Sequence, residues 1–458
     1  MLGIIFFIMM LILFLYRDSI FRLLPIKHVI IISLDTTRAD HLGCYGHPRI
    51  RTPSLDAVAK NALVFDNAIS VSSTTLPSHT SLFSGKYPKN HGTPANGYVI
   101  DLKNIMLPEI LKERGFETVG FIGAFPLSKW FGFAQGFDVF DEAFDRYVAD
   151  QKVSVHQRSA AAVTDAVVKY FKSGILPEHL FLFVHYYDPH NPYNPPRLYK
   201  RLFRTKYTRK GLKSGNLTPD SKVARVLKTQ AYEAEVTYMD RHIERLLNFL
   251  KKLEMLDESV LIITSDHGEN MLWDTHPFSH GWDTYQAVIK AVCMIRTPET
   301  VGTGRISEQL TANIDILPSL LNYLRISAHP HLDGECLSLT EPFNQSDDRP
   351  RFAECTKPEK CEDNGTWRNY LNARCVYQGS FKYIYTPHAN LEEFFNISQD
   401  PFEKQNLITS TDPKISAQIE SMKKELAQWF HATPYWHYEV KKDPSLETIQ
   451  KLEALGYL

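Results

Sequence analysis

The sequence predicts an α/β fold: a doubly wound, mostly parallel sheet flanked by helices, followed by a smaller C-terminal α+β domain. Three observations lead to this prediction. Short apolar runs recur along the first two thirds of the chain, amphipathic segments alternate with them, and the composition changes after about residue 328. With 458 residues, of which 43% are hydrophobic, the chain is long enough for one large core and a smaller companion.

The predicted strands are apolar along their whole length instead of alternating with polar residues. Such runs, rich in β-branched and aromatic residues, are typical of parallel strands that are covered on both faces. They lie at residues 28–35, 117–124, 180–188, 259–269 and 291–298. Segments with helical spacing separate several of them, at 159–174, 231–254 and 313–326. This alternation predicts a doubly wound α/β domain over residues 28–327.

The C-terminal part, residues 328–458, is richer in Pro, Asp, Gly and Cys. Residues 376–385 have the pattern of an antiparallel hairpin, and residues 416–434 that of a helix, which together predict the α+β domain. Four cysteines fall in this part. They form either two disulfides in an oxidising compartment or remain free thiols, and they are Cys336, Cys355, Cys361 and Cys375.

The N-terminal sixteen residues carry no charge and are followed directly by charged residues without a small-residue cleavage site. We therefore predict a membrane anchor or uncleaved signal over residues 1–24. The expected location is membrane-anchored with the catalytic domain outside the cytoplasm, in a periplasmic or extracellular space. The orientation stays open, because Arg17, Arg22 and Lys27 follow the apolar run and the positive-inside tendency favours the opposite side.

The formal net charge of −1 provides no basic field for a polyanion, so we expect no nucleic-acid partner. Potential metal ligands instead follow three of the predicted strands. They are Asp35, the pair Asp188 and His190, and the adjacent pair Asp266 and His267. Ligands bind beyond the carboxyl ends of strands in open α/β sheets, so this pattern predicts a metal site there.

Thr75 lies in the stretch TTLPSHTSLFSG, residues 74–85, just ahead of helix-starting Pro77 and Ser78. Its hydroxyl either caps a helix or lies where an anionic ester would dock at a helix N-terminus. Asp35, Asp266, His267 and Thr75 form a mixed oxygen and nitrogen donor set, which favours Zn or Mn over Ca. A metal-bound Thr75 hydroxyl would attack phosphorus or sulfur in line.

Other polar residues are candidates for substrate contact. His280 would protonate the leaving oxygen, bind the anion, or join Asp188 and His190 in a second metal site. Lys129 either reaches the anion or is simply solvated. His79 is a further candidate for substrate binding, but His79 and His185 are weaker candidates, because each is individually more typical of a packed or loop histidine.

Several segments resemble the sulfatase family of the alkaline phosphatase superfamily in order and spacing. They are residues 34–68, 74–92, 185–196, 264–270, 279–281 and 313–321, with tail segments 381–385, 400–407 and 452–458. The resemblance implies an alkaline phosphatase-like fold, with Thr75 as nucleophile and with Asp35, Asp266 and His267 as metal ligands. It also implies that His190 and His280 contact substrate.

The chain departs from the family pattern at its most characteristic positions. Sulfatases carry a Cys or Ser that becomes formylglycine in a Cys/Ser-x-Pro-x-Arg pattern, whereas this chain has Thr75, and His79 stands at the Arg position. We therefore expect no formylglycine. The family's Asp-Asp pair is Asp35-Thr36 here, its Asp-Asn pair is Asp266-His267, and its later anion-binding Lys falls near His280. These changes resemble the metal sites of related phosphodiesterases and phospho-group transferases.

The sequence thus predicts a metal-dependent hydrolase that cleaves sulfate or phosphate esters through Thr75. The expected metal is Zn or Mn, with Ca as an alternative, and the expected substrate is an anionic ester on a glycan, lipid or small molecule. Two other hypotheses remain: an anchored transferase that passes a phospho-group to a lipid or glycan, and a catalytically dead relative that binds an anion.

Overall fold

The computed structural model describes residues 26–144, 157–174, 176–208, 210, 221–271, 277–328, 331–341, 349–355, 372–432 and 441–442. Its central sheet has eight strands: β1 (His28–Leu34), β2 (Leu63–Phe65), β5 (Glu117–Phe121), β6 (Val139–Asp141), β7 (Leu180–Tyr186), β8 (Ser259–Ser265), β9 (Cys293–Arg296) and β10 (Arg305–Ser307). Their order is β10-β2-β9-β8-β1-β7-β5-β6. Strand β9 runs antiparallel to β8 and β2, and the other pairs are parallel. The sheet is mostly parallel, as predicted.

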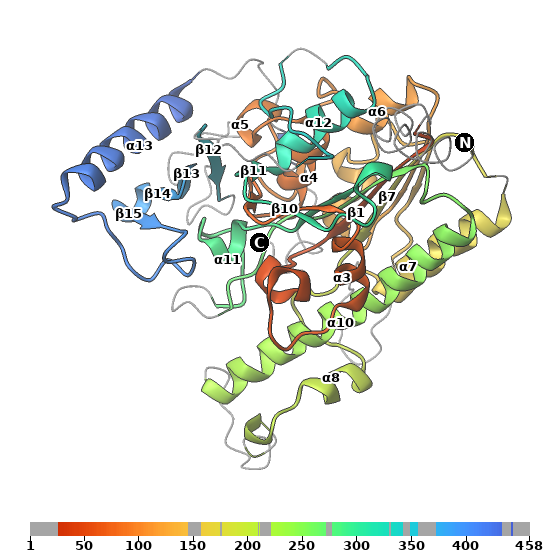
Figure 1. Ribbon diagram of the computed structural model, residues 1–458, viewed down its shortest axis with the longest axis horizontal. Helices are drawn as coiled ribbons and strands as arrows, with labels where there is room; N and C mark the ends of the chain where they lie inside the picture. The colour runs from red at the N-terminus through yellow and green to blue at the C-terminus, as the bar shows by residue number, and fades with distance from the viewer. Residues whose placement is uncertain are drawn as a thin grey trace, which may run out of the picture.

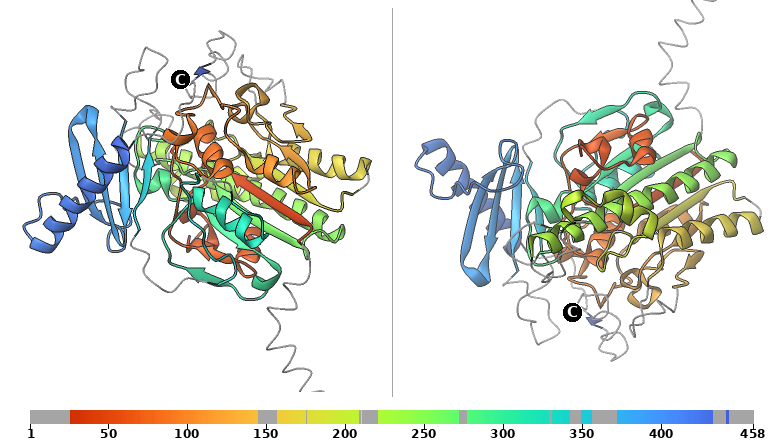
Figure 2. Two further views of the ribbon diagram at one scale, coloured as in Figure 1. Left: turned by 90° about the horizontal axis from the view of Figure 1, so that it is seen from above. Right: turned by 90° about the horizontal axis from the view of Figure 1, so that it is seen from below.

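Helices cover both faces of this sheet (Figures 1 and 2). The described helices of the whole chain are α3 (Pro53–Ala59), α4 (Thr75–Ser84), α5 (Pro88–His91), α6 (Leu107–Lys112), α7 (Ala160–Ser173), α8 (Arg197–Phe203), α10 (Lys222–Lys252), α11 (Gln286–Ile289), α12 (Ile316–Tyr323) and α13 (Pro413–His431). Single 3₁₀ turns lie at Ala39–His41, Gly43–Tyr45, Phe125–Leu127, Lys129–Phe131, Pro298–Thr300, Asn313–Asp315 and Pro387–Ala389.

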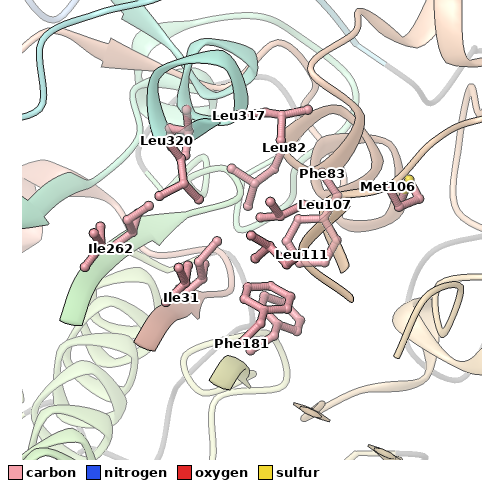
Figure 3. Packing of buried hydrophobic residues seen from close by; sticks show 14 of the residues in the cluster. Ile31, Leu82, Phe83, Met106, Leu107, Leu111, Phe181, Ile262, Leu317 and Leu320 are labelled. Carbon is pink, nitrogen blue, oxygen red and sulfur yellow. The ribbon is translucent and has the colours of Figure 1, made fainter. Parts of the chain in front are cut away.

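The central strands are buried on both faces, which explains their continuous apolar sequences. On β1, Val29 and Ile31 pack toward α4, α6 and α12, whereas Ile30 and Ile32 pack toward α3, α7 and α10. Figure 3 shows the first of these cores, with Ile31 and its neighbours on β7 and β8 beneath the leucines of the covering helices. The two-residue period of a strand sends alternate side chains into the two cores.

The C-terminal part forms a separate antiparallel sheet beside the main body (Figure 2). Its strands are β12 (Arg351–Glu354), β13 (Arg374–Gln378), β14 (Phe381–Thr386) and β15 (Leu391–Asn396), in that order across the sheet. Helix α13 packs on it through Ile419, Met422 and Leu426. Two small pairings complete the described strands: β3 (Ala68–Ile69) with β11 (Thr311–Ala312), and β4 (Tyr98–Val99) with β16 (Lys441–Lys442).

Each of the five predicted strands is present, and the predicted hairpin and α13 are confirmed. One helix prediction was too short: α10 begins at Lys222, where the Ser221 side chain accepts a hydrogen bond from the N–H of Ala224. The segment predicted as a helix from residue 313 opens with a 3₁₀ turn before α12.

The predicted anchor over residues 1–24 lies outside the described residues. Among the helices that are described, none is long and apolar enough to span a bilayer. Three of the four clustered cysteines, Cys336, Cys355 and Cys375, are free thiols, and Cys361 lies outside the described part.

Candidate active site

Asp35 and Asp266 lie side by side at the carboxyl edge of the central sheet. Strands β1 and β8 pair in parallel with Leu34 opposite Ser265, so the two aspartates follow at the same level. Both side chains are buried. Oδ1 of Asp266 accepts hydrogen bonds from the backbone N–H of Thr36 (3.1 Å) and of His267 (2.8 Å), which fixes the carboxylate. Its second oxygen, Oδ2, is then left for a ligand.

The His267 ring is oriented for metal binding. Its Nδ1 lies 2.9 Å from the carbonyl oxygen of Gly268. Because a carbonyl only accepts, Nδ1 carries the ring proton and Nε2 presents its lone pair. Nε2 lies 3.4 Å from Oδ2 of Asp266. Two ligands bound at about 2.1 Å to a tetrahedral zinc ion are separated by roughly this distance.

Asp35, Asp266 and His267 together form a donor set that fits a divalent cation. One ligand atom from each residue lies within 4.8 Å of the other two. Oδ1 of Asp35, Oδ2 of Asp266 and Nε2 of His267 are buried and have no hydrogen-bond partner within the described ranges. Burial, and next the Asp266 carboxylate, raise the pKa of Asp35 well above its ordinary value. A divalent cation would relieve this repulsion, because it favours both charged carboxylates.

Thr75 is placed beside this cluster by helix α4, which begins at that residue with Thr74 as its N-cap residue. The Thr75 hydroxyl donates to Oδ2 of Asp35 at 3.4 Å. Helix α4 is tied to the end of β8, because the hydroxyl of Ser78 donates to the Asp266 carbonyl at 2.8 Å. The hydroxyl therefore lies next to a carboxylate of the cluster and at a helix N-terminus, two features that the sequence predicts separately.

Two further histidines, His185 and His79, hold Asp35 and Thr75 in place through hydrogen bonds. The Gly123 N–H donates to Nδ1 of His185 (3.2 Å), so Nε2 carries the proton and donates to Oδ2 of Asp35 at 3.0 Å. His79 donates from Nδ1 to the Thr75 carbonyl at 2.8 Å. Burial lowers the pKa of His79 to about 3 and that of His185 to about 4, so both rings are neutral.

His190 and His280 extend the cluster on the side of His267. The ring centroids of His267 and His280 are 4.5 Å apart, and those of His280 and His190 are 5.1 Å apart. Nδ1 of His280 lies 3.3 Å from Oε1 of Glu269, and Nδ1 of His190 lies 2.6 Å from the carbonyl of Asn191. Both acceptors place the ring proton on Nδ1. The structure thus brings these two predicted substrate contacts beside the metal-ligand cluster.

Asp188 and Lys129 are two predicted site residues that do not belong to the cluster of Asp35, Asp266 and His267. Oδ2 of Asp188 accepts the N–H of Ala160 at 2.7 Å, at the start of α7, and burial raises its pKa to about 6. In the described part of the chain, no three-residue ligand cluster joins Asp188 with His190 and His280. The Lys129 side chain is mostly exposed and its Nζ lies 3.2 Å from Glu142, which fits the solvated alternative.

Glu269 is a site residue to which the sequence analysis assigned no role. It is buried, and its Oε2 accepts a hydrogen bond from the hydroxyl of Tyr193 at 2.8 Å while Oε1 faces His280. The signal in the sequence that points to Glu269 is its position two residues after His267. The backbone here is tightly packed, since a Cβ on Gly268 would lie 2.3 Å from the Ala287 carbonyl oxygen.

A second cluster of His41, His47 and Glu233 also has ligand atoms within 4.8 Å of one another. Its hydrogen bonds do not fit a metal site. The N–H of Ile50 donates to Nδ1 of His47 at 2.9 Å, so Nε2 carries the proton and faces Glu233 at 3.6 Å. This nitrogen is a donor to the carboxylate and lacks the lone pair that a cation needs.

Comparison with known proteins identifies the family to which the chain is similar. The sulfatase family model matches residues 27–326. An ulvan-active sulfatase from Formosa agariphila is 26% identical over 438 residues, covering 89% of this chain and 83% of that enzyme. An arylsulfatase from Clostridium perfringens is 23% identical, covering 84% of this chain and 91% of that enzyme.

Solved structures show the same fold. The phosphonate monoester hydrolase of Agrobacterium radiobacter superposes with a TM-score of 0.71 at 20% identity, over 88% of this chain and 95% of that protein. The yidJ protein from Bacteroides fragilis shares this architecture too, with a TM-score of 0.72 at 19% identity over 89% of this chain and 96% of that protein.

Proposed function

Because this chain belongs to the sulfatase family, whose enzymes are metal-dependent ester hydrolases, we propose that it cleaves sulfate or phosphate esters through the Thr75 hydroxyl. One observation carries the proposal: that hydroxyl lies 3.4 Å from Asp35, a member of the buried cluster Asp35, Asp266 and His267. Threonine is a weak nucleophile at neutral pH unless its proton is removed. A cation held by this cluster would lower the pKa of the Thr75 hydroxyl and so make its proton easier to remove.

Asp35, Asp266 and His267 would hold the cation, and the mixed oxygen and nitrogen donors favour Zn or Mn over Ca. When bound, such an ion lowers the pKa of a coordinated hydroxyl and offsets charge on the ester oxygens. His185 holds Asp35 in place, because its Nε2 donates to Oδ2 of that carboxylate. His267 is held in turn by the Gly268 carbonyl.

The proposed reaction has two steps: transfer of the sulfuryl or phosphoryl group to Thr75, and hydrolysis of the ester that this forms. Thr75 Oγ1 forms a bond to sulfur or phosphorus as the bond to the leaving oxygen breaks, and Oγ1 gives its proton toward Asp35. His280, doubly protonated beside the Glu269 carboxylate, supplies a proton to the leaving oxygen, which departs as an alcohol. Water then attacks sulfur or phosphorus and gives a proton back to His280, while Asp35 returns its proton to Oγ1, so the Thr75 hydroxyl is regenerated and sulfate or phosphate is released.

The substrate class that we propose is an anionic ester. The relatives support it, since one is named an ulvan-active sulfatase and another an N-acetylglucosamine-6-O-sulfatase. Phosphate esters are included beside sulfate esters because Thr75, His79 and His267 depart from the sulfatase pattern and resemble the metal sites of related phosphodiesterases. The family's Arg position is the neutral His79 here, and burial lowers the pKa of His190 well below its ordinary value, so charge compensation rests on the cation and on His280.

The test is a comparison of kcat/KM for an aryl sulfate, a phosphate monoester and a phosphate diester, each with Zn, Mn or Ca added to metal-free protein. We expect turnover of at least one ester, highest with Zn or Mn. Thr75→Ser should retain activity, because it keeps the hydroxyl, whereas Thr75→Ala should lose it. Equal rates for the wild type and Thr75→Ala on the preferred ester would exclude the proposed nucleophile.

A further inference from the structure

Helix α8, Arg197–Phe203, has two apolar faces of which only one is used for packing. On its inner face, the ring of Tyr199 lies against the ring of Tyr238 of α10, with their centroids 5.2 Å apart. Phe203 packs against the hydrophobic core between α10 and the central sheet. On its outer face, Leu198 is 68% exposed and Leu202 is 66% exposed. In a helix these positions, four residues apart, lie one above the other. Figure 1 shows α8 at the periphery of the molecule beside α10.

The exposed leucines are surrounded by positive charge. Residues 197–210 contain seven Lys and Arg and no Asp or Glu, in a chain whose net charge is only −1. Arg197 and Arg201 are exposed and each precedes one of the two leucines, so they share the outer face. Tyr207, 50% exposed, continues the apolar surface next to Lys206.

These cations are available to an external partner. Among the described residues, Arg197, Arg201 and Lys206 form no ion pair with an acidic side chain, whereas the charge of Lys200 acts on the buried carboxylate of Glu235. An interior helix would not carry this charge, and a solvated helix would not need exposed leucines at a four-residue spacing.

We propose that the outer face of α8, formed by Arg197, Leu198, Arg201 and Leu202, docks on an anionic lipid bilayer. Leucines that enter the boundary between headgroups and acyl chains, flanked by arginines at the level of the lipid phosphates, are the recognised chemistry of an interfacial helix. A soluble polyanion such as a sulfated glycan would pair with the arginines but would leave Leu198 and Leu202 in water, so the leucines favour the bilayer.

The segment that leads into α8 contacts a residue of the candidate active site. Tyr193, whose hydroxyl donates to Glu269, lies shortly before α8, and Asn194 donates its N–H to Glu235 at 2.6 Å. The segment that leads into α8 is thus fixed to the site. The docking proposal does not depend on the reaction, because none of its residues belongs to the metal cluster.

The test is hydrogen exchange of residues 197–208 in the full-length protein, reconstituted in nanodiscs of phosphatidylcholine with or without phosphatidylserine. Any anchor is present in both samples, so a difference reports α8 itself. We expect slower exchange with phosphatidylserine and loss of this protection in Leu198→Ser/Leu202→Ser. For Arg197→Gln/Arg201→Gln, the ratio of docked to undocked protein should fall by about 30-fold, at roughly five-fold for each cation.

The matched control is Ile306→Ser, which removes an equally exposed apolar residue (62%) on β10 and should leave the protection unchanged. Thr75→Ala should also dock normally, which separates this proposal from the proposed reaction. Equal exchange in both lipid compositions would overturn the proposal. Protection by dextran sulfate in solution without protection by phosphatidylserine would overturn it too, in favour of a glycan surface.

Discussion

Nδ1 of His79 donates a hydrogen bond to the carbonyl oxygen of Thr75 at 2.8 Å, one helical turn away. The other ring nitrogen, Nε2, lies 2.7 Å from the hydroxyl of Ser33 on β1, which donates to it. The neutral ring therefore joins the first turn of α4 to the strand that ends at Asp35. In the sulfatase pattern an arginine occupies this position, whereas here the neutral His79 supports the first turn of the helix that carries Thr75.

This support predicts the effect of His79→Ala. The variant leaves the Thr75 carbonyl and the Ser33 hydroxyl without their partner, so we expect a loss of about 2–4 kcal/mol in the free energy of unfolding. We also expect a lower kcat with a nearly unchanged KM. The matched control is His91→Ala, another buried histidine bonded to α4 at Ser81, which should destabilise without a comparable fall in kcat. Equal kcat values for the two variants would contradict a positioning role.

Metal binding should depend on Asp266 and His267 but much less on Thr75. In His267→Ala the cation loses its nitrogen ligand, so we expect metal content and activity to fall together. Thr75→Ala should retain metal while losing activity, because three ligand residues remain. Metal analysis of the purified variants, alongside His41→Ala from the second histidine cluster, checks this. Loss of metal in His41→Ala with full retention in His267→Ala would show that the cation binds at the other cluster.

A buried ion pair should stabilise the junction with the C-terminal sheet. Nζ of Lys382 on β14 lies 2.5 Å from Oε1 of Glu403, and Oε2 of Glu403 accepts the N–H of Gln286 at 2.6 Å. Lys382→Met leaves the buried carboxylate without its charge partner, at a cost of about 3–5 kcal/mol. Lys423→Met, which removes a partly exposed pair with Glu392, should cost less than about 1 kcal/mol in the same urea titration. Similar losses for both variants would argue against this difference.

Acid should destabilise the protein through its buried neutral histidines. Burial lowers the pKa of His91 to about 3 in the folded state from an ordinary value of 6.5. Between these values the unfolded chain binds the proton and the folded chain does not, so stability is present above pH 6.5 and is lost as the pH falls. His91 alone should account for about 2 kcal/mol between pH 6.5 and 5. Urea unfolding at both pH values should show a smaller loss for His91→Gln, and an unchanged loss would contradict the assignment.

The sequence was sufficient to predict the strands that build the site. Strands β1, β7 and β8 are buried on both faces, so their apolar runs are long and continuous. The edge strands β10 and β6 have three residues each and carry no comparable pattern. Their pairing is decided by tertiary contacts that a local pattern does not contain.

The candidate ligands were predictable because parallel strands end at one edge of the sheet. The direction in which each of these side chains points was not predictable from the sequence. Asp188 follows β7 as Asp35 follows β1, yet it accepts the N–H of Ala160 at the start of α7. His185 lies within an apolar run and was read as a packed histidine, but the sheet places it against Asp35. Such directions depend on register and on neighbouring elements.

The central claim is that the Thr75 hydroxyl itself attacks the ester. The most direct measurement is peptide mass mapping after rapid acid quench of metal-loaded protein mixed with its preferred aryl ester. We predict one sulfuryl or phosphoryl group on the peptide that contains Thr75, formed before steady state and absent in Thr75→Ala. Multiple turnovers by Thr75→Ala at the wild-type rate, or an adduct on a different residue, would contradict the account.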